Sequence, residues 1–228
     1  MKALKNYLSP EKRRLLKHIY NNIFHHQKKI QADNEYYKIA ESSFYGYYDI
    51  SPFNNRGHIC YLKYNESAHS KIDIYTTNIL TKNARIICSL NIWNWQQGCR
   101  LRWCDNGNSL LFNDYRNGQL MAVKKAVETG NECTYDYPFY DVSSDEKYAI
   151  TLDFVRLGYM RPGYGYVIGQ YVQPSCEDLY SNGISLYDID SRKVVRTVTY
   201  REILALREGS QADTKIENYY INHLSFSP

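Results

Sequence analysis

The chain of 228 residues lacks the features that would assign it to a membrane or a secreted class. No run reaches the roughly 18 consecutive apolar residues that a membrane-spanning helix needs. No apolar stretch of the kind found in secretory signals follows the first residues. We therefore expect a cytoplasmic protein, and a basic segment near the start, described below, leaves association with a membrane surface open.

Paired cysteine motifs are lacking too. The six cysteines are Cys60, Cys88, Cys99, Cys104, Cys133 and Cys176. None of them forms a CxxC pair, and no cysteine and histidine pairs have zinc-finger spacing. We expect reduced, partly buried thiols, with a disulfide framework as the alternative.

Common catalytic motifs are missing as well, since the chain has no P-loop, GxSxG or HExxH pattern. His58 lies at the start of a predicted strand and His69 in a predicted hairpin loop, so we expect both to be solvated. His223 follows Asn222 on a predicted inner strand and is the best candidate for a general base or a metal ligand. One imidazole without partners makes no mechanism, and no cofactor is evident.

An excess of positive charge is lacking outside the first 30 residues. These 30 residues hold eight Lys or Arg and one Glu, and the rest of the chain holds 20 basic and 23 acidic residues. A nucleic-acid-binding body would carry its own basic stripe. We therefore expect no nucleic-acid partner.

Residues 9–30 predict a helix. Ser9 can cap it, Pro10 suits its first turn, and apolar residues recur at helical spacing between Leu15 and Phe24. One interpretation is an amphipathic helix on an anionic membrane surface. The alternative is a helix that packs its apolar stripe on the body. We assign residues 1–40 to this helix and a linker.

Tyrosine is abundant, with 24 residues, and from residue 44 the periodicity is that of strands. A unit of strand, turn and three further strands recurs, with its turns at Ser51, Asp105 and Ser144. Four short strands per 40 to 50 residues are the signature of a β-propeller blade. The units lie at roughly 44–90, 98–137 and 139–200, and another starts at 221. We predict an all-β fold, a partial β-propeller of about three four-stranded blades plus one strand over residues 41–228, preceded by the amphipathic α-helix.

The turns and third strands resemble a known repeat. SPFNNRG, SSDEK and the terminal FSP resemble the SPDGK turn of Tol-type propellers, and KIDIYTTN and GISLYDID resemble its third strand. No turn has the full SPDG, and the third unit carries a long insertion. The stretches YGYYDISPFN, WNWQQGCRLRW, LLFND, RPGYGY and NHLSFSP together resemble bacterial propeller proteins encoded with cell-surface polysaccharide genes. This resemblance implies a polysaccharide context. A looser similarity to oligogalacturonate lyases implies a divalent metal held by histidines, of which only His223 could be one.

The unusual stretches fall in connections that a propeller gathers on one face. ESSFYGYY, WNWQQG, NYYINH, NDYRNG and RLGYMRPGYGYVIG share this face, and the three turns share the opposite one. The candidate substrate-binding residues are Tyr45, Tyr47, Trp93, Trp95, Gln96, Gln97, Arg156, Arg161, Tyr164 and Tyr166. Aromatic rings stack on sugars, amides bond hydroxyls, and guanidinium groups bind a carboxylate or phosphate.

Each of these residues also has a structural interpretation. The tryptophans can wedge between adjacent blades, and the two glutamines can be solvated loop amides. Arg156 and Arg161 can form salt bridges that hold the long loop, with Asp153 as a partner for either.

Three blades and one strand do not close a ring, because propellers need about four to eight blades. We therefore expect the N-terminal part of a longer propeller or a degraded gene, and association with the missing blades or with itself at the open C-terminal edge. The first functional hypothesis is a protein that binds or processes an acidic or neutral saccharide in surface polysaccharide biosynthesis. The alternatives are an oligogalacturonate-lyase-like enzyme with a divalent metal and a non-catalytic scaffold for other proteins.

Overall fold

The computed structural model describes residues 40, 42–65, 71–170, 175–206 and 218–227. The chain divides into two compact units, Met1–Ile39 and Ala40–Pro228, and the described residues all belong to the second. The predicted helix at 9–30 and His69 lie outside the described residues, so both interpretations of that helix stay predictions.

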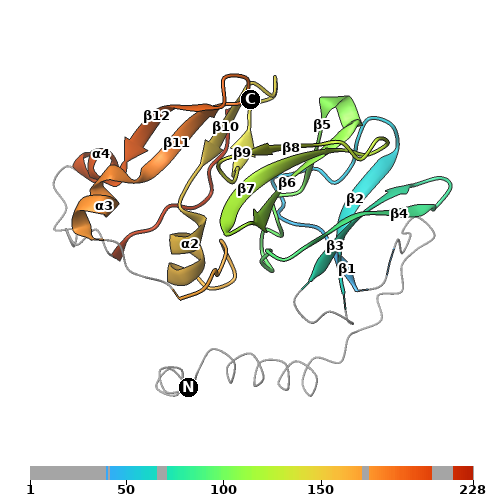
Figure 1. Ribbon diagram of the computed structural model, residues 1–228, viewed down its shortest axis with the longest axis horizontal. Helices are drawn as coiled ribbons and strands as arrows, with labels where there is room; N and C mark the ends of the chain where they lie inside the picture. Colours follow the sequence, from blue (N-terminus) through green and yellow to red (C-terminus); the bar gives the residue numbers. More distant parts are fainter. Residues whose placement is uncertain (1–39, 41, 66–70, 171–174, 207–217, 228) are drawn as a thin grey trace, which may run out of the picture. The chain divides into compact units, whose positions relative to one another are not determined.

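Three four-stranded antiparallel sheets form the body (Figure 1). Blade 1 consists of β1 (Ser43–Phe44), β2 (His58–Tyr64), β3 (Ile72–Asn78) and β4 (Ala84–Leu90). Blade 2 consists of β5 (Arg102–Cys104), β6 (Ser109–Arg116), β7 (Gln119–Ala126) and β8 (Glu132–Tyr135). Blade 3 consists of β9 (Asp141–Val142), β10 (Tyr148–Thr151), β11 (Gly183–Asp188) and β12 (Lys193–Thr199). In each sheet the strands pair in chain order, which confirms the prediction of a partial all-β propeller.

The two blade junctions form the core. Cys60 and Leu62 of blade 1 pack with Leu110 of blade 2, while Leu111 packs with Tyr187 of blade 3. Successive side chains of a strand point to opposite faces of its sheet. Blade 2 can therefore bury one face against each neighbour, and the first six residues of its strand β6 are all buried.

The turns that follow the innermost strands lie together on one side of the blades. The Asn54 side chain donates to the Gly107 carbonyl at 3.2 Å, and the Glu146 carboxylate accepts from the Asp105 backbone N–H at 2.9 Å. The short 3-10 helix η2 (Asp105–Gly107) forms the turn of blade 2. We call this side the turn side.

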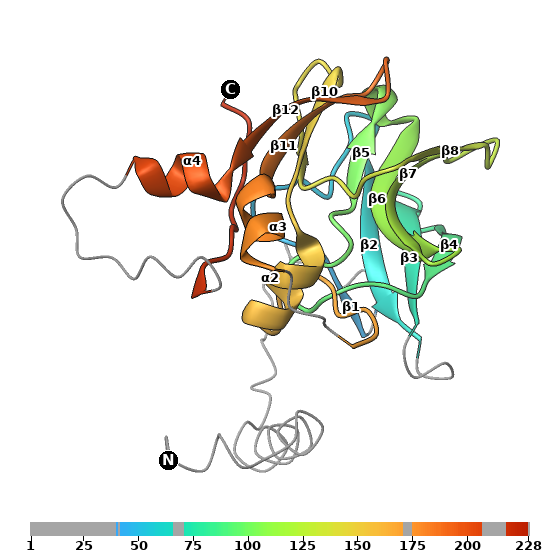
Figure 2. The same cartoon turned by 60° about the vertical axis from the view of Figure 1, so that its left-hand side comes forward.

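The insertion in blade 3 contains two short helices, α2 (Phe154–Met160) and α3 (Cys176–Ser181), and α4 (Tyr200–Ala205) follows β12. Asp153 caps α2 by accepting from the Arg156 backbone N–H at 2.8 Å. Helix α4 begins with a capping box in which Thr199 and Glu202 bond each other's backbone. Helices α3 and α4 lie next to each other at the end of blade 3 (Figure 2).

Residues 218–227 form no strand, although a further blade is predicted to begin at residue 221. The segment runs beside β9, where the Phe226 N–H donates to the Asp141 carboxylate at 2.9 Å. Asp141 also accepts from Arg102 of blade 2 at 2.6 Å. A hydrogen bond thus links the segment to β9, just as one links β9 to β5 of blade 2. The start of a fourth blade at residue 221 stays a prediction.

Candidate functional site

Four connections meet on the side of the blades away from the turns, and we call this surface the loop rim. Its segments are residues 45–48, 93–98, 161–166 and 219–223. The Gln96 N–H donates to the Gly163 carbonyl at 3.3 Å. A Cβ atom on Gly46 would lie 2.8 Å from the Gln97 carbonyl oxygen, so only glycine allows this close approach. The sequence predicted that these connections would share a face, and they are in contact.

Three rings from three of these segments pack together on the loop rim. The ring centroid of Tyr47 lies 5.6 Å from that of His223 and 6.2 Å from that of Tyr164, and the last two are 6.2 Å apart. His223 is exposed, and its backbone N–H donates to the Tyr140 hydroxyl at 3.1 Å. His223, the candidate general base, is therefore exposed at the surface beside two tyrosine rings, and a hydrogen bond fixes its backbone.

The hydroxyl of Tyr47 stays protonated over the physiological range. Desolvation and a hydrogen bond with Tyr164 raise the pKa of Tyr47 to about 12. A neutral phenol is both a donor and an acceptor, so Tyr47 offers the loop rim both functions.

The two neighbouring tryptophans have different environments. Trp93 is half-buried and packs against the core between blades 1 and 2, as the structural interpretation requires. The side chain of Trp95 is 62% exposed. Trp93 contacts it edge-on at 4.5 Å between centroids, and Phe44 lies at 5.6 Å. Trp95 is thus an exposed indole on an aromatic support, and Gln96 beside it is also exposed.

Arg161 is the exposed cation of the loop rim. Its guanidinium carbon lies 5.1 Å from the centroid of the Tyr164 ring, which supports the side chain from one side.

The structure corrects the expected exposure of Gln97 and Tyr45. Gln97 is 0% exposed, and its amide donates to the Tyr140 hydroxyl at 2.7 Å and to Asn222 at 3.2 Å. The half-buried Tyr45 donates to the Leu101 carbonyl at 2.8 Å. Both side chains join consecutive inner segments through these hydrogen bonds, and the Gln97 Oε1 atom is buried without a hydrogen-bond partner.

Arg156 and Tyr166 are corrected in the same way. Arg156 is 1% exposed, and its guanidinium donates to the Tyr219 carbonyl at 2.6 and 2.9 Å. Tyr166 is 0% exposed, and its hydroxyl accepts from the Asn113 amide at 3.1 Å. Helix α2 turns Arg156 inward, where it holds the insertion to the segment after α4 through the Tyr219 carbonyl, and the salt bridge with Asp153 stays a prediction.

An ion pair between the buried Arg100 and the partly exposed Asp49 lies beneath the loop rim and was missed by sequence reasoning. The side chain of Arg100 is 2% exposed and bonds both oxygens of Asp49, at 2.9 and 3.3 Å. Its Nε donates to the Tyr140 carbonyl at 2.7 Å, and its guanidinium lies 4.1 Å from the Tyr140 ring centroid. Burial raises the pKa of Tyr140, so this ring stays neutral beside the cation. The one available signal was an arginine in the apolar stretch CRLRW.

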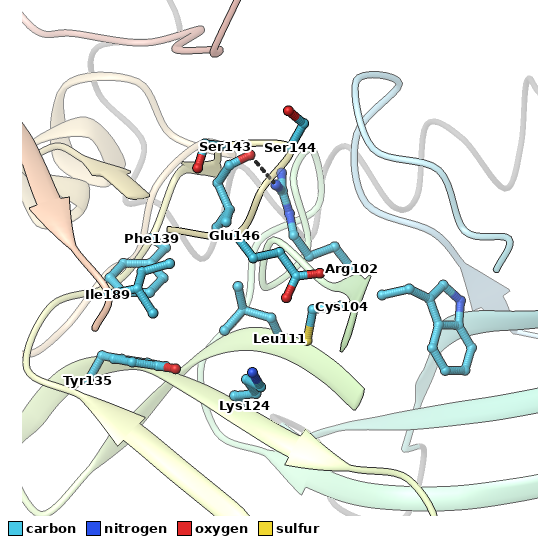
Figure 3. A pocket seen from close by; sticks show the side chains of 12 residues that line it. Arg102, Cys104, Leu111, Lys124, Tyr135, Phe139, Ser143, Ser144, Glu146 and Ile189 are labelled. Carbon is cyan, nitrogen blue, oxygen red and sulfur yellow. Dashed lines mark hydrogen bonds between the residues drawn. The ribbon is translucent and has the colours of Figure 1, made fainter. Parts of the chain in front are cut away.

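The turn side holds a cavity of about 210 Å³ between blades 2 and 3 (Figure 3). Lys124 pairs with Asp105 at 2.6 Å, and Glu146 extends toward the middle of the cavity. Burial acts against the charged form of Asp105, but the hydrogen bond from Lys124 lowers its pKa overall. Burial raises the pKa of the Cys104 thiol to about 12. These charges satisfy one another and link the two blades.

Metal ligands do not gather in the described part of the chain, where no group of three or more His, Cys, Asp or Glu side chains is placed to hold an ion. The metal role of His223 in the lyase-like alternative therefore stays a prediction. Among the helices of the described residues, none is long and apolar enough to cross a membrane.

Comparison with known proteins gives similarity in structure only. No family model matches the sequence, and no curated protein matches it. TolB from Acinetobacter baumannii is similar at 16% identity with a TM-score of 0.43, covering 70% of this chain and 32% of that one. The putative TolB from Agrobacterium tumefaciens is similar at 14% identity with a TM-score of 0.44. The match covers 70% of this chain and 50% of that one. The β-propeller domain of the Trilobed protease from Pyrococcus furiosus is similar at 15% identity with a TM-score of 0.39. The match covers 65% of this chain and 40% of that one.

This chain spans half or less of the length of each of these structures. They include the Tol type that the turns resemble. The fold assignment depends on the three sheets themselves.

Proposed function

We propose that the loop rim binds a saccharide chain, as part of bacterial surface polysaccharide biosynthesis in the cytoplasm. The observation that supports this most is Trp95, whose indole is 62% exposed yet fixed by Trp93 and Phe44. A large apolar ring held at the surface costs free energy that ligand contact would recover. Its flat face suits a pyranose ring.

Polar groups beside the indole suit hydroxyls. The exposed Gln96 amide has both donors and an acceptor, and the neutral Tyr47 hydroxyl has one of each. Both lie in segments that contact each other through Gln97 and Gly46, so their spacing is fixed. Sugars present donors and acceptors on neighbouring carbons, which this combination matches.

Arg161 favours an acidic sugar over a neutral one. Its guanidinium is exposed and is oriented by the Tyr164 ring. A guanidinium can donate two parallel hydrogen bonds to a carboxylate. Arg156 contributes nothing to this preference, because it is buried.

Isothermal titration with an oligogalacturonate tests the proposal. We expect Trp95→Ala to weaken binding by up to about tenfold, because an aromatic contact is worth about 0.5–1.5 kcal/mol. Arg161→Gln should weaken binding of the oligogalacturonate and leave that of a neutral oligosaccharide unchanged.

Tyr148→Ala is the matched control, since it removes a ring that is 38% exposed on β10 of blade 3. It should bind like the wild type. Equal affinity of Trp95→Ala and the wild type, or no binding by the wild type, would contradict the proposal. The lyase-like and scaffold alternatives have no specific observation in their favour and stay predictions.

A further inference from the structure

A second cavity, of about 360 Å³, lies between blades 1 and 2 on the turn side. We call it the turn cavity. The residues on which the argument depends are Arg56, His58, Asn78, Arg85, Trp103 and Glu128. They come from the turn of blade 1, strands β2 to β5 and the connection between β7 and β8 of blade 2.

The wall from blade 1 is polar where a blade junction is otherwise apolar. Cys60 and Thr76 are cross-strand partners. His58 and Asn78 are also cross-strand partners, and His58 lies two residues nearer the turn of blade 1 than Cys60 does. Residues two apart on a strand share a face. Cys60 is fully buried in the core, so His58 and Asn78 face blade 2 as well. His58 and Asn78 therefore give this end of the junction a polar wall, and the Asn78 Oδ1 also accepts from the Leu80 and Thr81 N–H groups of the next turn.

The charge of the turn cavity is positive. Arg56 projects from the turn and donates to the Asn108 side chain. Arg85 lies opposite the acid Glu128 at 3.4 Å, and their side chains are 51% and 89% exposed. An ion pair this exposed holds its partners weakly. Two guanidinium groups therefore line the cavity, and that of Arg85 is weakly paired with the Glu128 carboxylate.

A fixed indole forms the wall from blade 2. The Trp103 Nε1–H donates to the Pro52 carbonyl at 2.8 Å, which links blade 2 to the turn of blade 1. Its ring centroid lies 6.5 Å from that of His58. The cavity thus combines cations, amides and a rigid aromatic surface.

We infer that the turn cavity binds a sugar phosphate. The two guanidinium groups suit the phosphate, the amide and hydroxyl lining suits the sugar hydroxyls, and Trp103 offers its face to the ring. The volume is within the range of small-ligand sites. This site lies on the turn side and is separate from the loop rim.

Isothermal titration with glucose 6-phosphate, inorganic phosphate and glucose tests the inference at constant ionic strength. We expect glucose 6-phosphate to bind most tightly and inorganic phosphate to compete with it. Arg56→Gln combined with Arg85→Gln should weaken binding of glucose 6-phosphate about tenfold or more. The reason is that hydrogen bonds to charged groups contribute more than those between neutral groups. Both side chains are exposed, so the fold should persist, as circular dichroism would verify.

Arg196→Gln is the matched control, because it removes an exposed arginine from β12 of blade 3 instead. It should bind glucose 6-phosphate like the wild type. Unchanged binding in the double variant would overturn the inference. Equal affinity for glucose and glucose 6-phosphate would overturn the role of the phosphate, and equal affinity for inorganic phosphate would overturn the role of the sugar. The double variant separates the two sites, because Arg56 and Arg85 line the turn cavity and neither lies in the loop rim.

Discussion

At the scale of single residues, burial decides what a polar side chain does. Arg156 and Arg161 have the same chemistry and lie five residues apart, yet the first is 1% exposed and the second is exposed. Inside the fold a guanidinium must find acceptors, and Arg156 finds the Tyr219 carbonyl. At the surface Arg161 shares hydrogen bonds with Tyr220 and Tyr164, which raise its pKa, and its guanidinium stays exposed to a ligand.

The cysteines give a prediction at the same scale. Burial raises the pKa of Cys88 and Cys104 to about 12, and it raises that of Cys99 well above the usual value of a thiol. The thiolate is the reactive form, so at pH 8 only about one in 10⁴ of the Cys88 and Cys104 thiols is ionised. We expect these thiols to react with Ellman's reagent slowly in the folded protein and fast after unfolding.

The measurement is made in a Cys176→Ser background, so that only the described cysteines report. Cys133 is half-buried at the edge of blade 2 and should give the fast phase. Cys133→Ser should remove that phase, and Cys104→Ser should leave it unchanged. A fast phase that survives Cys133→Ser would show that a core thiol is accessible.

At the scale of elements, strands were predictable and the insertion was not. Each of the strands β2 to β8 lies where the sequence predicts a strand. Alternating apolar residues indicate the strands, and turn residues such as those of DNGN mark their ends. Helix α2 has seven residues with two turns at most, too few for a helical period to emerge. Without that helix, Arg156 could not be recognised as inward-facing. Packing between distant segments also hid the burial of Gln97 and Tyr166.

Two glycines of the insertion give a matched pair of variants. Gly165 has a positive φ of +62°, and a Cβ there would lie 2.3 Å from the Phe154 carbonyl oxygen. Gly169 has a similar φ of +56° and nothing within 4 Å. Alanine at either site costs about 1–2 kcal/mol because of the left-handed conformation.

Gly165→Ala should lower the free energy of unfolding by about 1–3 kcal/mol more than Gly169→Ala, because the backbone of α2 must also move. Urea unfolding followed by circular dichroism measures both values. The same loss in the two variants would show that α2 and residue 165 do not pack as described.

At the scale of the whole molecule, side chains near the innermost strands connect each blade to the next. Tyr45 bonds the Leu101 carbonyl, Arg102 bonds Asp141, and Asp141 bonds the N–H of Phe226. The innermost strands have only two or three residues, so few backbone ladders hold them. These side-chain bonds therefore carry much of the contact between consecutive inner segments.

Cutting one of these connections should destabilise the whole domain. The side chains of Arg102 and Asp141 are each 16% exposed, whereas Arg196 and Glu202 on blade 3 are 65% and 44% exposed. Arg102→Met should lower the free energy of unfolding by about 3 kcal/mol, since it leaves a largely buried carboxylate short of its partner. Arg196→Met should cost at most about 1 kcal/mol.

Thermal unfolding monitored by calorimetry compares the two variants. A loss in Arg102→Met no larger than in Arg196→Met would mean that the blades are held by apolar packing alone.

Trp103 lines both the 210 Å³ and the 360 Å³ cavities, and its Nε1–H is held by the Pro52 carbonyl. One residue thus belongs to the cavity walls on both sides of blade 2. A substitution of Trp103 would therefore alter both cavities at once.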